Sequence, residues 1–321
     1  MSGSANTMKM AGTRDAFGEA IVELGKENKK IVVIDADLAE STRTHRFKET
    51  FPDRFIQLGL HEQDMVSTAA GLAASGLIPF ATSFVVFLSG IPWIQIRQSV
   101  CLSHHNVKLV ASHGGITVGE DGASHQGCED FALMSVLPHM TVICPADAAE
   151  TKKAVKAIAE HDGPVYMRLS REKFPVLFDE SYHFKIGKAR RLQEGEDVSL
   201  LGTGLMVYHS LLAAELLKVN GISARVINVS TIKPLDIEEI VKAARETGCI
   251  VTAEEHSVIG GLGSLVASRV SKECPVPIEM IGVHDQFGFS GKPEELLAHF
   301  HLMPKDIEEA ALKVIERKRR R

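Results

Sequence analysis

Residues 30–41 read KIVVIDADLAES, and this short stretch already indicates the class of fold. Residues 31–34 are all apolar, and two carboxylates, Asp35 and Asp37, follow at the end of the run. A strand without a polar face is typical of a parallel sheet that helices cover on both sides. Residues 13–27, just before it, carry apolar side chains at helical spacing, so a helix is expected to lead into the strand.

The same alternation of apolar strand and helix continues along the chain. Strands are expected at 55–59, 78–84, 107–113, 140–147 and 164–170, with helices at 62–75, 88–103, 127–136 and 147–161. A second series places strands at 198–204, 224–230, 250–256 and 277–283, with helices at 207–219, 236–246, 260–272 and in the C-terminal segment. The charge-rich segment 172–195 is expected to be an extended connector. The sequence therefore predicts an α/β protein of two doubly wound domains, residues 1–184 and 185–321.

Composition and charge narrow the class of protein. The formal net charge is −5, so no general attraction to nucleic acid or to an acidic membrane is expected. No apolar run reaches the ~18 residues of a membrane span, and residues 1–17 lack a secretory signal pattern. The five cysteines are scattered and lack CxxC spacing, which favours reduced thiols over disulfides or a zinc site. We therefore expect a soluble, cytoplasmic protein without a metal site of its own.

The stretch SHGGITVGEDGASHQGCED, residues 112–130, holds His113, Asp121 and His125 among five glycines. A glycine-rich loop of this length loses conformational entropy on folding without burying apolar surface, so core packing does not account for it. Polar loops on a rigid scaffold are frequent binding sites. Ligand binding is the favoured interpretation, whereas a metal site and an inert loop are the alternatives.

Several shorter motifs each admit a structural and a functional interpretation. The glycines of LGTG (201–204) and IGGLGS (259–264) suit tight turns or a phosphate-binding helix start, and neither completes a dinucleotide-binding motif. The phenylalanines of 80–88 suit core packing. The polar turn 35–42 suits a capped turn or a ligand contact, and the arginines of 168–173 suit surface pairing or a phosphate.

Residues 59–76 read GLHEQDMVSTAAGLAASG, a helix of small apolar residues with Glu62 at its start. Small side chains allow close packing, so this helix is expected to be largely buried. A carboxylate in the first turn of a helix is favoured by the helix dipole, which is the structural interpretation. The functional interpretation is a carboxyl that is kept away from water for its chemistry.

Three of these motifs, in this order, resemble the transketolase family of thiamine-diphosphate enzymes. Residues 59–76 resemble its pyrimidine-domain signature, GEDGASHQ (119–126) its sugar-recognition loop, and TAEEHSVIGGLGS (252–264) its C-terminal domain. The resemblance covers essentially the whole chain. It implies a pyrimidine-binding domain followed by a transketolase C-terminal domain, and transfer of a two-carbon ketol unit between phosphorylated sugars, as in the pentose phosphate pathway.

The family's diphosphate-binding GDG motif is absent from this sequence. The resemblance is therefore to the C-terminal subunit of a split transketolase, whose N-terminal subunit is a separate polypeptide. It implies that the partner supplies the diphosphate and Mg²⁺ site, that this chain binds the pyrimidine end of thiamine diphosphate, and that it cannot hold the cofactor by itself. Self-association of the chain within a heterotetramer is also implied.

The resemblance assigns roles to ten residues. Glu62 matches the glutamate that hydrogen-bonds N1′ of the cofactor's aminopyrimidine, and Glu62 and His125 are the expected catalytic residues. The residues expected at the cofactor besides Glu62 are Phe84, Phe87 and Asp37. The residues expected at the sugar or its phosphate are Asp121, His125, His113, Arg14, Ser41 and Arg171.

The sequence departs from the family pattern at His61, Asp64 and Phe289, which leaves details of the cofactor edge and the preferred sugars open. Three other functions remain as alternatives. They are a beta subunit of a 2-oxo-acid dehydrogenase, a fragment of a deoxyxylulose-phosphate synthase, and a non-catalytic subunit that only stabilises a partner.

Overall fold

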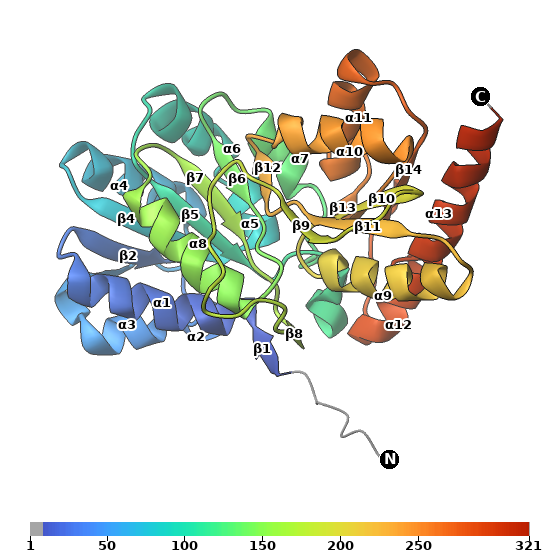
Figure 1. Ribbon diagram of the computed structural model, residues 1–321. Helices are drawn as coiled ribbons and strands as arrows, with labels where there is room; N and C mark the ends of the chain where they lie inside the picture. The colour runs from blue at the N-terminus through green and yellow to red at the C-terminus, as the bar shows by residue number, and fades with distance from the viewer. Residues whose placement is uncertain (1–8, 321) are drawn as a thin grey trace.

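The computed structural model describes residues 9–320 and contains two main β-sheets flanked by helices (Figure 1). In Figure 1 the blue-to-green first part lies beside the yellow-to-red second part. The structure does not describe residues 1–8 and Arg321. For residues 1–8, the expectation that the chain lacks a secretory signal pattern therefore depends on the sequence only. Across residues 9–320, no helix has both the length and the apolar character that crossing a membrane requires.

The first sheet has seven strands in the order β12-β6-β7-β5-β4-β2-β3, and all neighbours are parallel except β12 and β6. Every residue of β2 is buried, which confirms the strand expected from its apolar run. The strands are β2 (Ile31–Asp35), β3 (Phe55–Gln57), β4 (Ile78–Phe84), β5 (Lys108–Ser112), β6 (Thr141–Ile143), β7 (Val165–Arg168) and β12 (Thr231–Lys233).

Helices cover both faces of this sheet. Ile31 and Val33 pack in one apolar cluster with α1 (Thr13–Glu27) and α8 (Ala148–Glu160). Ile34, which points to the opposite face, belongs to a different cluster with α4 (Glu62–Ala74). Side chains that alternate along β2 therefore enter two cores, as a doubly covered sheet requires. The remaining helices of this part are α2 (Ala39–Thr42), α3 (His45–Thr50), α4 (Glu62–Ala74), α5 (Val85–Gly90), α6 (Trp93–Gln95) and α7 (Asp130–Ser135).

The prediction of a single helix over residues 88–103 is wrong. The chain forms α5, then α6, and then a π-helix at Ile96–Leu102. Pro92 lies at the junction of α5 and α6, where its missing N–H and its ring are incompatible with a continuous α-helix. The helix expected over 127–136 exists but is limited to α7, because the glycine-rich segment before it stays irregular.

The second sheet has the order β14-β13-β10-β11-β9, with β9 antiparallel to its neighbour and the other pairs parallel. Two short strands interrupt the segment expected to be an extended connector, and the first of them, β8, pairs with β1. The strands β1 (Met10–Gly12) and β8 (Lys173–Pro175) form a separate two-stranded sheet. The strands of the second sheet are β9 (Arg190–Gln193), β10 (Val198–Gly202), β11 (Ala224–Asn228), β13 (Ile250–Ser257) and β14 (Ile278–Val283). The helices are α9 (Met206–Val219), α10 (Ile237–Thr247), α11 (Leu262–Glu273), α12 (Pro293–His299) and α13 (Pro304–Arg319).

The two parts of the chain are joined by a shared sheet and a shared apolar core. After β11 the backbone leaves the second sheet, and β12 joins the first sheet antiparallel to β6. Cys144 N–H donates to Ser230 O over 2.8 Å beside this strand. One apolar cluster includes both Ile34 of the first sheet and Ile227 of the second. The α/β architecture is as expected. The domain boundary near residue 185 stays a prediction.

Candidate active site

Several of the residues singled out in the sequence follow the carboxyl ends of strands in the first sheet. Phe84 is the last residue of β4, His113 follows β5, and Arg171 follows β7 after two residues. Asp37 follows the end of β2 after one residue. The carboxyl ends of parallel strands meet at one edge of a sheet, which is where open α/β sheets bind ligands.

Glu62 is the first residue of α4, and its side chain is buried, with 5% of the residue exposed. Ser83 Oγ donates a hydrogen bond of 3.0 Å to Glu62 Oε1. Among residues 9–320, this is the hydrogen bond that the Glu62 side chain makes. A buried carboxyl with one neutral partner keeps an acceptor for a ligand.

The helix behind Glu62 is less buried than its small residues suggested. Ala69 and Ala70 are fully packed, whereas Gly71 and Ala74 are exposed. A helix that packs on one side buries only the residues that recur every 3.6 positions, and α4 packs against β4 and the π-helix on that side. The expectation of a largely buried helix therefore holds for one face only.

An aromatic cluster stands beside this carboxyl at the end of β4. The rings of Phe84 and Phe87 are stacked with centroids 5.9 Å apart, and the Phe84 ring stacks on that of His113 at 3.8 Å. His125 meets the Phe87 ring edge-on at 5.3 Å. The cluster brings together residues expected at the cofactor and residues expected at the sugar, from two separate segments: the junction of β4 and α5, and the loop 113–129.

His113 is held in one orientation and in its neutral form. Its Nδ1 lies 2.8 Å from Ser112 Oγ, and Arg14 Nη1 donates to its Nε2 over 3.3 Å. Because Arg14 can only donate, Nε2 is the acceptor and Nδ1 carries the proton. Burial is the main cause that lowers the pKa of His113, to about 3, and the positive charges of Arg14 and Arg171 add to it. The residue also has a φ of 62°, which is uncommon for a side chain other than glycine.

Arg14 is a cation without an anionic partner in the described chain. Its Nη1 also donates to Ser41 O over 3.2 Å, and its buried Nε has no hydrogen-bond partner among residues 9–320. None of the ion pairs in that part of the chain involves Arg14. Burial lowers the pKa of Arg14, and the nearby charge of Arg43 lowers it further. A partly buried guanidinium with a free donor is suited to bind an anion.

Arg171 lies on the other side of the cluster and already has partners. Its Nη1 donates to Val118 O over 2.6 Å and lies 3.4 Å from Asp121 Oδ2. Asp121 is exposed and Arg171 is half-buried. Arg171 thus holds the turn of the 113–129 loop that carries Asp121, and a ligand phosphate would have to share this arginine with that carboxylate.

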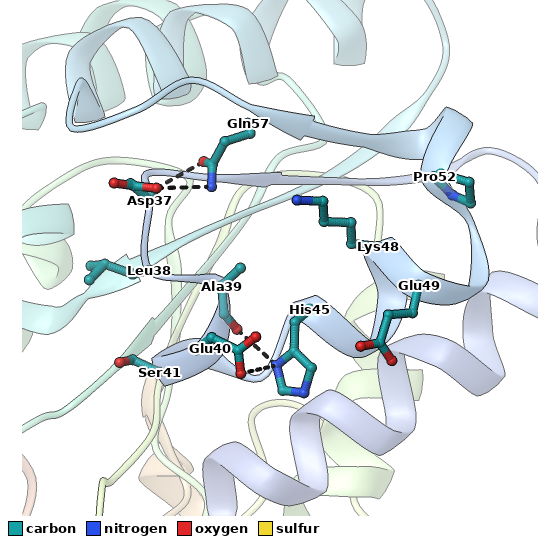
Figure 2. Close-up of a pocket in the computed structure, with 10 residues that line it drawn as sticks. All are labelled: Asp37, Leu38, Ala39, Glu40, Ser41, His45, Lys48, Glu49, Pro52 and Gln57. Atoms are coloured by element: carbon teal, nitrogen blue, oxygen red, sulfur yellow. Dashed lines mark hydrogen bonds and ion pairs between the residues drawn. The ribbon is translucent and has the colours of Figure 1, made fainter.

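Asp37 and Ser41 line a pocket of about 640 Å³ that also contains His45 and Lys48 (Figure 2). Asp37 is exposed, and its N–H donates to Gln57 Oε1 over 2.9 Å. Figure 2 shows Asp37 and Gln57 on one side of this pocket and Ser41 on another. Ser41 links the pocket to Arg14. Asp37 is therefore placed at the margin of the site, not in the aromatic cluster.

Comparison with known proteins decides the family. The family model for the transketolase pyrimidine-binding domain matches residues 9–176, and that for the transketolase C-terminal domain matches residues 187–307. The chain belongs to the transketolase family. The resemblance inferred from the three motifs, and the fold class inferred with it, are confirmed.

Similar proteins include subunits of split transketolases. The inactive β4 tetramer of a split-gene transketolase is 48% identical, with a TM-score of 0.90 over 96% of this chain and 99% of that chain. The 6-deoxy-6-sulfo-D-fructose transketolase subunit of Clostridium sp. strain MSTE9 is 44% identical over 95% of both chains. Transketolase of Homo sapiens is 38% identical over 90% of this chain, which spans only 46% of the human protein.

Two residues of this transketolase-family chain were missed in the sequence. Ser83 contacts Glu62, and its signal is the pair of hydroxyl residues, Thr82 and Ser83, in an otherwise apolar strand. Glu255 contacts the backbone of the glycine-rich loop, and its signal is the run of titratable residues in buried β13. Both contacts join segments that are far apart in the chain, so spacing could not reveal the partners.

A buried polar network lies beneath the site, between the two parts of the chain. Arg168 Nη1 donates to Asp130 Oδ1 over 3.1 Å, and Tyr166 OH donates to Asp130 Oδ2 over 2.9 Å. Arg168 and Asp130 are both buried. Burial is the largest single influence on the pKa of Arg168 and would lower it, but Asp130, Cys144, Glu255 and Cys128 together outweigh burial and raise it. His256 joins the network where its Nε2 accepts from Phe131 N–H over 3.1 Å.

Replacing His256 by Gln is expected to make the chain more tolerant of acid. Burial is the main cause that lowers the pKa of His256, to about 4, and the positive charge of Arg168 adds to it. A charged ring would also lose the acceptor that Nε2 offers to the Phe131 N–H. The unfolded chain takes up this proton near pH 6.5, so the stabilisation is complete above that pH and is lost as the pH falls towards 4. Between pH 7 and pH 5 the wild type should lose about 2 kcal/mol through this group.

The measurement is the fall in Tm between pH 7 and pH 5, by scanning calorimetry, for wild type and H256Q. The glutamine can accept the same hydrogen bond without titrating. His183 is exposed, so H183Q serves as the control and should keep the wild-type pH dependence. An equal fall in Tm for H256Q and wild type would show that His256 does not carry the acid sensitivity.

Proposed function

We propose that this chain is the pyrimidine-binding subunit of a two-polypeptide transketolase. The reaction is the transfer of a two-carbon ketol unit from a ketose phosphate to an aldose phosphate, with thiamine diphosphate as cofactor. The observation that carries the proposal is the buried Glu62 carboxyl, with Ser83 as its partner, at the strand end that bears the stacked Phe84 and Phe87.

These residues fit an aminopyrimidine ring. Phe84 and Phe87 offer an apolar wall, and Glu62 offers an oxygen that the described chain leaves free to meet a ring nitrogen. When bound, thiamine diphosphate supplies a carbon that accepts and returns the two-carbon unit. Glu62 would hold a proton at N1′ of the ring, and the phenylalanines would exclude water from that contact. Asp37 would lie at the cofactor's margin.

The sugar phosphate would lie against the 113–129 loop and Arg14. Arg14 provides a cation with an unused donor, and its neighbours Ser41 and His113 keep it in place. A neutral His113 can hydrogen-bond a phosphate or hydroxyl oxygen only by exchanging one of its present partners. The side chains that would contact the sugar hydroxyls and the second side of the phosphate are Asp121, His125 and Arg171.

A second polypeptide would complete the site. The chain matches 46% of human transketolase, but 95% of the Clostridium sulfofructose transketolase subunit and 99% of the split-gene transketolase chain. The similar split-gene protein forms a β4 tetramer that is inactive. The diphosphate and Mg²⁺ would therefore be held by an N-terminal subunit, in a cytoplasmic heterotetramer that contains two copies of this chain.

Reconstitution with the N-terminal subunit tests the proposal. The two purified chains are assayed together and separately with xylulose 5-phosphate and ribose 5-phosphate. We expect turnover in the mixture, dependent on thiamine diphosphate and Mg²⁺, and none from either chain by itself. A 6-sulfo ketose is included as donor, because one similar subunit belongs to a transketolase for 6-deoxy-6-sulfo-D-fructose.

Two outcomes would contradict the proposal. Turnover by the isolated chain would exclude the need for a partner. Oxidation of a 2-oxo acid, in place of ketol transfer, by the mixture would favour the dehydrogenase alternative. If the mixture does transfer the ketol unit, comparing kcat/KM for the phosphate and the 6-sulfo donor would show which anionic group the Arg14 region prefers.

A further inference from the structure

The 113–129 loop carries three residues that we propose to contact the sugar: His113, Asp121 and His125. It connects β5 to α7 and contains only a short 3₁₀ segment. Three of its glycines have positive φ, between 74° and 84°. Glycine has the largest conformational freedom of any residue, so ordering this loop costs more entropy than ordering most loops. Hydrogen bonds within the loop, such as Gly115 N–H to Gly127 O over 2.9 Å, offset part of that cost, and contacts from outside the loop add to them.

Backbone and side-chain hydrogen bonds tie this loop to the second part of the chain. Thr117 N–H donates to Glu255 Oε1 over 2.5 Å, from the middle of the loop to β13. Gln126 Nε2 donates to Phe289 O over 3.0 Å. Ser257 N–H, also in β13, donates to the loop's last part over 2.8 Å, at Cys128 O. The anchors precede and follow Asp121, so they bracket the substrate-reading turn.

The loop backbone also lies directly against these anchors. A Cβ on Gly115 would collide with the Glu255 carboxyl and would lie 2.6 Å from Arg168 Nη2. A Cβ on Gly122 would lie 2.6 Å from Ser290 Oγ. Because real Cβ atoms do not approach other atoms so closely, only glycine allows this contact. Gly115 and Gly122 therefore allow the loop to approach the second part of the chain closely, whereas Gly114 and Gly127 face Arg168 and Val85 of the first part.

Glu255 is itself held rigidly. It lies in β13, between β10 and β14, and 8% of the residue is exposed. Arg168 Nη2 donates to Glu255 O over 2.6 Å, which joins its backbone to the buried network of Asp130. Burial raises the pKa of Glu255 and Arg168 opposes this shift. In either protonation state the carboxyl retains an oxygen that can accept the Thr117 amide.

We infer that Glu255 is a positioning residue for sugar recognition: by holding the Thr117 amide it places Asp121 and His125 at the substrate. The second domain thereby contributes to the affinity for the sugar, whereas the aminopyrimidine contacts of Glu62 and Phe84 belong to other elements. The inference rests on the proposed function, because that function assigns the sugar to this loop.

The test uses E255A and E255Q in two measurements. The first is hydrogen–deuterium exchange of peptides from 113–129 in the isolated chain. The second is KM, kcat and cofactor affinity in the reconstituted enzyme. For E255A we expect loop exchange and the KM for the ketose phosphate each to rise about tenfold, the factor of one such hydrogen bond. Apparent affinity for thiamine diphosphate should stay within about twofold.

E255Q should recover both values, since its amide oxygen accepts the Thr117 N–H. S199A is the matched control, because Ser199 lies in β10 of the same sheet and its Oγ bonds Thr247 Oγ1 at the end of α10 over 2.9 Å, away from the loop. Exchange of the loop at the wild-type rate in folded E255A, or an unchanged KM, would overturn the inference. Should the wild-type mixture lack ketol transfer, the proposed function is wrong, while loop exchange in the isolated chain still decides whether Glu255 holds the loop.

Discussion

E62Q is expected to reduce kcat of the reconstituted enzyme by about 10²- to 10⁴-fold, the range for loss of a positioned acid–base group. Glutamine has the shape of glutamate and can still accept from Ser83 Oγ, so α4 and the end of β4 should keep their structure. An amide cannot hold or release the proton that Glu62 would share with N1′ of the aminopyrimidine. The measurement is the steady-state rate with both subunits, cofactor and Mg²⁺.

The control for this variant is E238Q. Glu238 also lies in the first turn of a helix, α10, but it is exposed. Removing its charge tests the effect of the helix dipole without touching the site. Wild-type turnover by E62Q would rule out an acid–base role for the buried carboxyl. It would then favour a subunit that only stabilises its partner.

D130A is expected to destabilise the chain by about 3–5 kcal/mol, because it leaves the buried Arg168 charge without its carboxylate. Tyr166 OH loses its acceptor in the same step. For a chain of this size such a loss corresponds to a Tm lower by about 10 °C, measured by scanning calorimetry at pH 7. The network joins β7 to α7, so the loop before α7 should also exchange faster.

An exposed ion pair provides the matched control. Glu23 and Lys26 are 2.7 Å apart and both mostly in solvent, so E23A should change stability by at most about 1 kcal/mol. A Tm for D130A equal to that of E23A would mean that the buried pair contributes no more than a surface pair. A double variant, D130L with R168M, should recover part of the loss, because it removes both buried charges together.

Most of the first sheet could be predicted because the local composition of its strands is typical of buried strands. The apolar run 31–34 is buried on both faces, and such runs recur in β4, β5 and β7. Local composition failed at Pro92, where an apolar, helix-compatible stretch is divided into α5, α6 and a π-helix. It also gave no sign of β12, since a three-residue strand carries little pattern and its pairing depends on β6.

The candidate site was predictable to the extent that its residues lie in motifs. Phe84, His113 and His125, which come from two of these motifs, do meet. The partner of each side chain was not predictable. Arg14 contacts His113 from 99 positions away, and Asp37 is hydrogen-bonded to Gln57 on one side of a separate pocket.

Local order along the chain was thus sufficient to determine the alternating α/β architecture, the family, and the segments from which a site is built. Periodicity and motif spacing extend over a few residues only, so both can be read directly from the sequence. Only the tertiary structure decided that Ser83 meets Glu62, that Arg14 lacks a carboxylate among the described residues, and that Glu255 holds the glycine-rich loop. Those contacts depend on how separate elements pack, because hydrogen bonds act over about 3 Å and the sequence contains no distances.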